Sequence, residues 1–540
     1  MVLSTSDLHK AAPAGPAEAE ADRRSANWSP GEHPSKLSQA GSGSGSFSLG
    51  DEEKQVAAQV GAVTTDPATP LDSNIVDWNG PDDSGNPVNF SGLIKGTNVG
   101  IVSALTFITP LASSMFAPSV PQLMEEFNTT NTLLGSFVVT VYVLGFAIGP
   151  LILAPASELV GRAIIYHVCN LGFTVFTIAC AVSTDMGMLI VFRFFQGCFG
   201  SAPVTNGGGT IADLIVQEKR GGVIAIYALG PLLGPVIGPV AGGYLTAAKG
   251  WRWVFWVLAI VGGFCTIVCF LFLRETYPTI LLKRKTQRLI KETGNTNLRS
   301  KRDNGLSTGQ LFLQALTRPF KILFLSPIVF VSSIYVGIVY GYQYLMFSTF
   351  TEVFEDQYRW PTKSSGLSFL GIGVGSLLGL FVIGVASDRI LKAKSQPTPE
   401  APSGGMKPEY RLPPLVVGAF CIPAGLFMYG WSTYYKTHWI VPLIGTAIMG
   451  IGNIAVFMCI TSYLVDAFVI YAASALAANT VVRSIMGALL PLAGPAMYDS
   501  MGLGWGNSLL GFIAVVCIPV PWVMMRYGER MRLAFDASKL

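Results

Sequence analysis

The stretch Gly230-Pro-Leu-Leu-Gly-Pro-Val-Ile-Gly-Pro-Val-Ala-Gly-Gly243 lies inside an uncharged run that extends from about 221 to 246. A glycine recurs at every fourth residue, so the glycines share one face of a helix. Three prolines remove backbone donors from the same helix, which must bend or be supported by a neighbour. We interpret the segment as a hinge or gate, with a tight helix contact as the simpler alternative. The candidate hinge residues are Gly230, Pro231, Gly234, Pro235, Gly238, Pro239, Gly242 and Gly243.

Apolar runs of similar length occur on both sides of this segment. Apolar residues make up 51% of the chain and charged residues only 13%, and a membrane-spanning helix needs roughly 20 apolar residues. The runs lie at about 97–119, 131–154, 163–183, 186–206, 221–246 and 252–273, and then at about 322–348, 364–386, 413–431, 439–464, 468–495 and 504–525. This pattern predicts an all-α integral membrane protein with twelve transmembrane helices in two six-helix bundles related by pseudo-two-fold symmetry.

The composition between these runs predicts the domain boundaries. The first 95 residues are rich in Ala, Gly, Ser, Pro and Asp and lack apolar surface, so we expect a disordered tail. A basic stretch separates the two groups of runs. The predicted parts are a tail at 1–95, a first bundle at 96–273, a linker at 274–321, a second bundle at 322–525 and a C-terminal tail at 526–540.

The distribution of charge predicts an orientation. Lys and Arg concentrate in the tails, the central linker and the other loops on their side of the membrane, which places both termini in the cytosol. We expect the plasma membrane as the location. The net charge of +4 is too small, and too confined to loops, to suggest nucleic acid as a partner. The sequon Asn128-Thr-Thr130 falls in the first external loop, which makes Asn128 a candidate glycosylation site.

Signatures of enzymes are lacking in the sequence. No Gly-x-x-x-x-Gly-Lys-Ser/Thr loop for ATP is present. Gly371-Ile-Gly-Val-Gly375 superficially resembles a dinucleotide fingerprint, but it lies in an apolar helix with no strand before it, so we interpret it as a close helix contact. Cys265 and Cys269 share a helix face without further ligands, which is a poor metal site. We therefore expect neither enzyme activity, cofactor nor metal.

The Gly-Pro-x-x-Gly-Pro-x-x-Gly-Gly pattern resembles the antiporter motif of the major facilitator superfamily, found in the fifth span of its drug:proton exporters. Ala156-Ser-Glu-Leu-Val-Gly-Arg162 is similar to the superfamily's loop motif, in which an acid, a glycine and a base latch the cytosolic side. Ala163 stands where a second base is common. A degenerate second copy is Gly384-Val-Ala-Ser-Asp388-Arg389. The resemblance implies gating roles for Glu158, Gly161, Arg162, Asp388 and Arg389.

The fourth span carries Arg193-Phe-Phe-Gln196-Gly197, which is similar to the superfamily's Arg-x-x-Gln-Gly motif associated with proton coupling. Val76-Asp-Trp-Asn-Gly-Pro-Asp-Asp83, Arg274-Glu-Thr-Tyr-Pro278 and the stretch from Tyr471 to Arg483 resemble the fungal twelve-spanner branch of drug:proton antiporters. The resemblance covers about residues 74 to 530. It implies a monomeric secondary active transporter that exports small amphipathic drugs, toxins or secondary metabolites by proton antiport and confers multidrug resistance. A nutrient importer or facilitator and a non-transporting sensor are the alternatives.

The charged residues within the runs are few. A guanidinium in mid-span costs roughly 2.5–3.5 kcal/mol on insertion scales, so Arg193 is expected to face a polar interior with a partner. Arg483 is a second, weaker case. No Asp or Glu lies inside the apolar cores, which argues against a pump dedicated to strong cations. The carboxylates at span ends, Glu158, Asp213 and Asp466, remain equal candidates for the proton carrier.

The substrate cavity is expected to be lined by aromatic and amide groups, because sites for varied apolar ligands are built in this way. Each candidate residue could equally be an ordinary packing residue. The candidates are Phe107, Tyr227, Tyr340, Tyr342, Gln343, Asn453 and Asn479.

Overall fold

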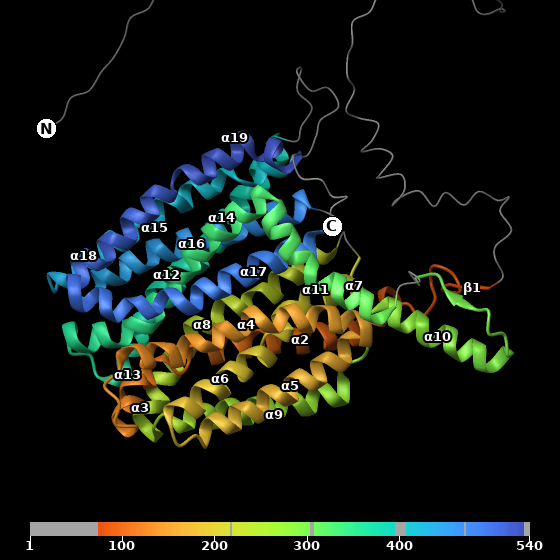
Figure 1. The fold of residues 1–540 in the computed structure, drawn as a ribbon, viewed down its shortest axis with the longest axis horizontal. Coiled ribbons are helices and arrows are strands. Elements are labelled where there is room, and N and C mark those ends of the chain that lie inside the picture. The colour runs from red at the N-terminus through yellow and green to blue at the C-terminus, as the bar shows by residue number, and fades with distance from the viewer. Residues whose placement is uncertain (1–73, 217–218, 303–306, 395–406, 469–470, 534–540) are drawn as a thin grey trace, which may run out of the picture. The chain divides into compact units, whose positions relative to one another are not determined.

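The computed structural model describes residues 74–216, 219–302, 307–394, 407–468 and 471–533 (Figure 1). The part of the predicted N-terminal tail before residue 74 and the last seven residues of the C-terminal tail lie outside the described residues. Within the described ranges the chain is almost entirely helical, and its one sheet is a pair of two-residue strands. The predicted all-α class is therefore confirmed.

Eleven stretches of the described chain are long and apolar enough to cross a membrane. The last of them, Ala472–Leu533, has 62 residues, which as one straight helix would be about 90 Å long, three times the hydrocarbon thickness. It is interrupted at Gly502, whose φ is 72°. Figure 1 shows that the chain reverses there, so α17 and α19 run in opposite directions. This stretch thus supplies two passes, and the predicted number of twelve is confirmed.

The helices form two bundles in chain order. The first bundle contains α2 (Gly92–Ser114), α4 (Thr132–Val160), α5 (Arg162–Ala181), α6 (Met186–Gly200) with α7 (Ala202–Leu214), α8 (Arg220–Lys249) and α9 (Arg252–Phe272). The second contains α12 (Pro327–Tyr358), α14 (Leu370–Lys394), α15 (Pro413–Tyr434), α16 (Ile440–Ala467), α17 (Ala472–Leu489) and α18 (Gly494–Cys517) with α19 (Pro519–Leu533).

Short elements mark the two ends of the bundles. One end carries α3 (Val120–Glu126) after η2 (Ala117–Ser119), and α13 (Thr362–Ser365) with η4 (Gly366–Phe369); we call it the α3 end. The other end carries α10 (Pro278–Thr293) and α11 (Thr308–Leu325); we call it the α10 end (Figure 1). The remaining short elements are β1 (Ile75–Val76), η1 (Pro87–Asn89), β2 (Arg299–Ser300), η5 (Pro408–Arg411) and η7 (Leu490–Ala493).

Polarity is distributed as a bilayer requires. Large apolar side chains such as Phe264, Leu271 and Phe381 are exposed on the outside of the helices, where lipid replaces water as solvent.

Close helix contacts depend on small residues. A Cβ at Gly375 would lie 1.9 Å from the Ala447 carbonyl oxygen of α16. The predicted packing role of the 371–375 glycines is borne out by this contact.

The two bundles meet closely at the α3 end. A Cβ at Gly366 in η4 would lie 2.2 Å from the carbonyl oxygen of Pro239 in α8, and one at Gly243 would lie 3.1 Å from the Thr362 carbonyl oxygen. A Cβ at Gly373 of α14 would lie 2.2 Å from the Val236 side chain of α8. Backbone therefore lies against backbone here, and the α3 end is closed between the bundles.

Residues 74–95, which the sequence places in the disordered tail, are ordered, and this corrects the predicted boundary. Strand β1 pairs in parallel with β2 of the linker, with Ile75 opposite Arg299. The Lys285 ammonium in α10 donates hydrogen bonds to the Asp77 carbonyl, Asn79 Oδ1 and Asp83 Oδ2. The segment is thus held by partners about 200 residues away in sequence. Its polar composition, taken alone, therefore led to the wrong prediction of disorder.

Candidate transport site

The glycines of the α8 segment lie against α2. A Cβ at Gly230 would lie 2.9 Å from the Phe107 backbone nitrogen, one at Gly234 2.8 Å from the Phe107 carbonyl oxygen, and one at Gly242 1.9 Å from the Met115 carbonyl oxygen. Any side chain at these positions would push α8 away from α2. The glycine face is therefore a track on which two helix backbones touch.

A neighbouring hydroxyl replaces one of the backbone donors that the α8 prolines remove. Pro239 has no N–H, so the Pro235 carbonyl loses its helical donor. Ser114 Oγ of α2 lies 3.3 Å from that carbonyl oxygen and donates to it. Neighbouring side chains of this kind are what permit prolines within membrane-spanning helices. The hinge role predicted for this segment remains a proposal. If α8 moves as a hinge, it must slide along its contact with α2.

Arg193 in α6 is fully buried and is bound by backbone carbonyls. Its Nη1 lies 3.0 Å from the Ala112 oxygen, its Nη2 3.2 Å from the Ser113 oxygen, and its Nε 3.3 Å from the Val138 oxygen. Carbonyls in the last turn of a helix have no intrahelical donor and carry the negative end of its dipole. The guanidinium therefore caps α2 at its C-terminus and ties it to α4. In the described part of the chain, carbonyl oxygens rather than a carboxylate face this charge.

The rest of the Arg-x-x-Gln-Gly motif supports this packing. Gln196 Oε1 accepts from Arg193 Nη1 at 3.3 Å, and its Nε2 donates to Thr177 Oγ1 at 2.8 Å. A Cβ at Gly197 would lie 2.1 Å from the Tyr142 carbonyl oxygen. The Tyr142 ring in turn lies 5.0 Å from the Arg193 guanidinium carbon. The three motif residues hold α2, α4, α5 and α6 together.

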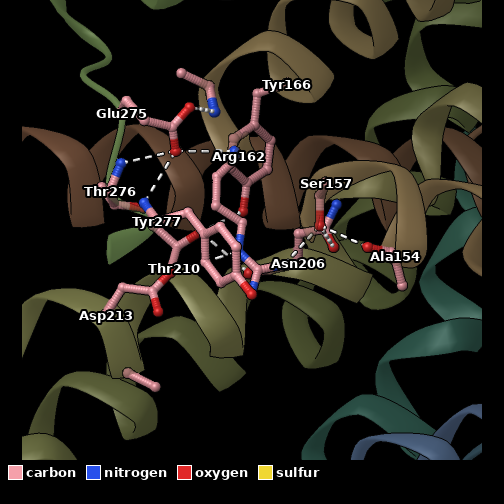
Figure 2. A network of polar contacts seen from close by, with 12 residues as sticks. Ala154, Ser157, Arg162, Tyr166, Asn206, Thr210, Asp213, Glu275, Thr276 and Tyr277 are labelled. Carbon is pink, nitrogen blue, oxygen red and sulfur yellow. Dashed lines mark hydrogen bonds and ion pairs between the residues drawn. The ribbon is translucent and has the colours of Figure 1, made fainter. Parts of the chain in front are cut away.

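At the α10 end, Glu275 caps the start of α5 (Figure 2). Its Oε1 accepts from the Arg162 N–H at 2.9 Å and its Oε2 from the Ala163 N–H at 3.3 Å. Gly161 has a φ of 112°, and a Cβ there would lie 2.2 Å from Glu275 Oε2. Only glycine fits such a conformation and such a contact. Carboxylates are favoured at this position by the free N–H groups and the dipole of the helix.

The Arg162 side chain points away from Glu275 into the bundle (Figure 2). Its Nη1 donates to Ser157 Oγ at 2.6 Å, and its Nε lies 3.4 Å from Asp213 Oδ2. Glu158, the acid that the motif offered as a partner, is exposed. Asp213 and Glu275 therefore occupy the positions expected of Glu158. Ser157 and Glu275 lie in the quoted stretches 156–162 and 274–278 but were given no role, because the sequence does not show that the two stretches meet.

The second bundle repeats this arrangement with a different arginine than predicted. Arg411 Nε lies 2.7 Å from Asp466 Oδ2, and its Nη1 lies 3.3 Å from Asp388 Oδ1. Arg389, the predicted base, is exposed. Arg162 with Asp213 and Arg411 with Asp466 both join the start of the third helix of a bundle to the end of the fourth. The Arg411–Asp466 pair is thus the pseudo-two-fold counterpart of Arg162–Asp213. The adjacent residues Asp388 and Arg389 do not form such a pair.

The candidate cavity residues fall into two groups. Phe107, Tyr227, Tyr340 and Gln343 are half-buried. Tyr342 is buried and donates to the Leu510 carbonyl at 3.1 Å, so it packs inside the second bundle rather than lining a cavity. Tyr227 also has protein partners, because its hydroxyl lies 2.9 Å from the Val204 carbonyl oxygen.

Asn453 and Asn479 are both buried, and each has side-chain atoms without a hydrogen-bond partner in the described structure. Asn453 lies on α16 and Asn479 on α17, and Asn479 is four residues before Arg483. Asn128, the candidate glycosylation site, is exposed directly after α3. Of the predicted cavity residues, Tyr340 lies over the Arg483 guanidinium, and Asn479 lies one turn from that arginine on α17.

Comparison with known proteins decides the family. The model of the Major Facilitator Superfamily matches residues 102–491. The chain belongs to the major facilitator superfamily. The superfamily consists of transporters, so this chain is a membrane transporter and not an enzyme. Its helical fold is the one that the sequence resemblance predicted.

Three relatives with high sequence identity come from fungi. The chain is 80% identical to the MFS-type transporter tndD of Aspergillus flavipes, over 91% of this chain and 90% of that protein. It is 57% identical to the MFS-type transporter penM of Penicillium rubens, over 85% and 90%. It is 51% identical to the efflux pump radE of Floropilus chiversii, over 93% and 92%.

Among solved structures, the xylose transporter XylE of E. coli has a TM-score of 0.61 with 16% identity and covers 81% of this chain and 98% of its own. At this identity the likeness shows the superfamily fold alone.

Proposed function

We propose that the protein exports small amphipathic molecules, such as drugs, toxins or secondary metabolites, by proton antiport and alternating access. The observation that carries the proposal is the double contact of α8. One face of the helix lies on the α2 backbone through Gly234 and Gly242, and its neighbouring residues touch η4 and α13 of the other bundle. Any rocking of the bundles must move this contact. The name of the relative radE, an efflux pump, supports the direction of transport.

We propose that the α10 end faces the cytosol, that the protein resides in the plasma membrane, and that it acts as a monomer. The α10 end carries the basic linker and the basic α19, in line with the positive-inside rule. The closed α3 end would then be the external side. Asn128 would lie outside the cell, where glycosylation is possible.

We assign proton coupling to Asp213. Of the three carboxylates that the sequence left open, its side chain is 14% exposed, Asp466 is 28% exposed, and Glu158 is on the surface. Arginine does not titrate in proteins, so the proton must reside on the acid of the pair. Protonation of Asp213 would remove the attraction for Arg162 and loosen the end of α7 from α5.

The test is transport in inside-out vesicles from a pump-deficient yeast that expresses the chain. A screen for lowered accumulation and raised resistance first selects a transported amphipathic dye. Vesicles with an acidic interior should concentrate the dye, and nigericin, which collapses the pH gradient, should abolish the uptake. Asp213→Asn should bind the dye but show no response to the gradient. Uptake that continues after the gradient is collapsed would reject proton coupling.

A further inference from the structure

Arg483 lies in the middle of α17, between rings from two other helices. Its guanidinium carbon is 4.8 Å from the centroid of the Tyr340 ring of α12 and 5.1 Å from that of the Phe457 ring of α16. Aromatic faces attract a cation through their quadrupole, but they leave its N–H groups free to donate hydrogen bonds. The rings therefore position this guanidinium without satisfying it.

The two mid-span arginines, Arg193 and Arg483, differ in the hydrogen-bond partners of their guanidinium groups. Arg193 donates to carbonyls of α2 and α4 and to Gln196. Arg483 has a buried Nε with no hydrogen-bond partner. Among the described residues it forms no ion pair. A charge left in this state inside a membrane protein is costly and marks a functional site.

Other polar groups without a partner lie on α17 and α16, the helices that carry Arg483 and Phe457. Asn479 lies one turn before it on the same face of α17, and its Oδ1 is buried without a partner. Both side-chain polar atoms of Asn453, one turn from Phe457 on α16, are in the same state, as is the hydroxyl of Ser484. These three side chains are 2%, 6% and 1% exposed, respectively. Buried polar groups are almost always hydrogen-bonded, so these exceptions require an explanation.

We infer that Arg483, with Asn453 and Asn479, binds the anionic group of the substrate, so that the transported molecules are amphipathic acids carrying a carboxylate or a comparable oxyanion. A guanidinium presents a planar fork of donors that matches two carboxylate oxygens. The Asn453 amide adds a donor, and the Tyr340 and Phe457 rings offer apolar surface for the remainder of the molecule. This inference rests on the proposed export function, because it names the class of substrate.

Binding measured without transport tests the inference separately from proton coupling. Dansylglycine carries a carboxylate, and its methyl ester has the same fluorophore without the charge. Both are titrated against the full chain in lipid nanodiscs, with empty nanodiscs as the blank, and dansyl fluorescence reports occupancy. The wild type should bind the acid about tenfold more tightly than the ester, as a charge-assisted pair predicts. Failure of the vesicle experiment would leave this result unchanged.

Arg483→Gln should remove the preference for the acid while the affinity for the ester stays the same. Arg483→Lys, which keeps the charge but loses the fork, should retain part of the preference. Arg526→Gln, at an exposed arginine of α19, is the matched control and should behave like the wild type. Equal affinity of the wild type for the two dyes would overturn the inference, and so would a preference that Arg483→Gln retains.

Discussion

Ser113 of the first bundle and Tyr344 of the second share a hydrogen bond, with 3.2 Å between the serine Oγ and the phenol oxygen. The carbonyl of the same serine accepts from Arg193 Nη2 at 3.2 Å. The Tyr344 ring lies 4.9 Å from the ring of Tyr340, which covers Arg483. A continuous set of contacts thus joins the two mid-span arginines across the interface of the bundles.

Removal of this hydrogen bond should open the α3 end. In Tyr344→Phe the closed arrangement loses one buried hydrogen bond, worth about 1 kcal/mol, which is about a fivefold shift toward the open arrangement. Spin labels at the exposed Lys249 and Lys363, one in each bundle, measure this by double electron–electron resonance after replacement of the eight native cysteines, all of which are free. A distance distribution identical to that of the unsubstituted protein would show that the bond does not hold the end closed.

The arginine that caps α2 should be needed for stability as well as for transport. Arg193→Ala leaves the carbonyls of Ala112 and Ser113 buried without donors, and we expect a loss of about 3 kcal/mol. The detergent-solubilised variant should melt well below the wild type, whereas Arg526→Ala should not. Arg193→Lys should lie between them, because an ammonium cannot reach carbonyls of two helices at once. A wild-type melting temperature for Arg193→Ala would contradict the capping role.

The contact between α8 and α2 can be tested with two glycines of one helix. Gly242→Ala places a methyl group 1.9 Å from the Met115 carbonyl oxygen, and overpacking of this kind costs about 1–3 kcal/mol. At Gly222 no heavy atom lies within 4 Å of a Cβ, so Gly222→Ala is the matched control. Thermal unfolding and dye export should both suffer in the first variant and not in the second. Equal stability and export in the two variants would mean that α8 can move away from α2 without a loss of free energy.

The symmetry of the arginine–aspartate pairs predicts which base of the second bundle matters. Arg411→Ala removes the partner of Asp466 and Asp388, and we expect transport to slow severalfold. Arg389→Ala, at an exposed neighbour of Asp388, should export at the wild-type rate. The comparison uses initial rates of dye uptake at equal amounts of protein in the vesicles. A stronger transport defect in Arg389→Ala than in Arg411→Ala would show that Arg389, the base in the sequence motif, is the functional one.

The segment before α2 should be held by α10 over most of the pH range. Hydrogen bonds from the Asn79 and Gly85 N–H groups and from Lys285 lower the pKa of Asp83 to about 2. The depressed pKa means that the contact stabilises the fold above the ordinary carboxyl value of 3.8 and is lost as the pH falls through about 2. Protection of residues 74–90 in hydrogen exchange should therefore be the same at pH 7 and pH 5.

Lys285→Ala should release this segment at every pH. Lys283→Ala is the control, because Lys283 is exposed on the same helix. Protection that persists in Lys285→Ala would show that the β1–β2 pair suffices to hold the segment.

Several features could be predicted from local patterns. The apolar runs give the number of passes and their division into two bundles, because a bilayer demands that each crossing satisfy its own backbone. The glycine spacing predicts that one face of α8 touches another helix, since small residues permit close approach. Burial of Arg193 is equally predictable, because a charge in mid-span must turn inward.

The partners of these residues were not predictable, because they come from distant parts of the chain. Arg162 meets Glu275 and Asp213 rather than the adjacent Glu158, and Arg411 replaces Arg389 in the second bundle. The ordering of residues 74–95 by Lys285 has the same origin.

Local sequence determined which segments lie in the membrane, because hydrophobic burial depends on composition over about 20 residues. Only the tertiary structure decided which charges are satisfied, because a hydrogen bond depends on angles and distances between helices. It assigns Arg193 to carbonyls of its own bundle and leaves Arg483 between two rings with a free donor.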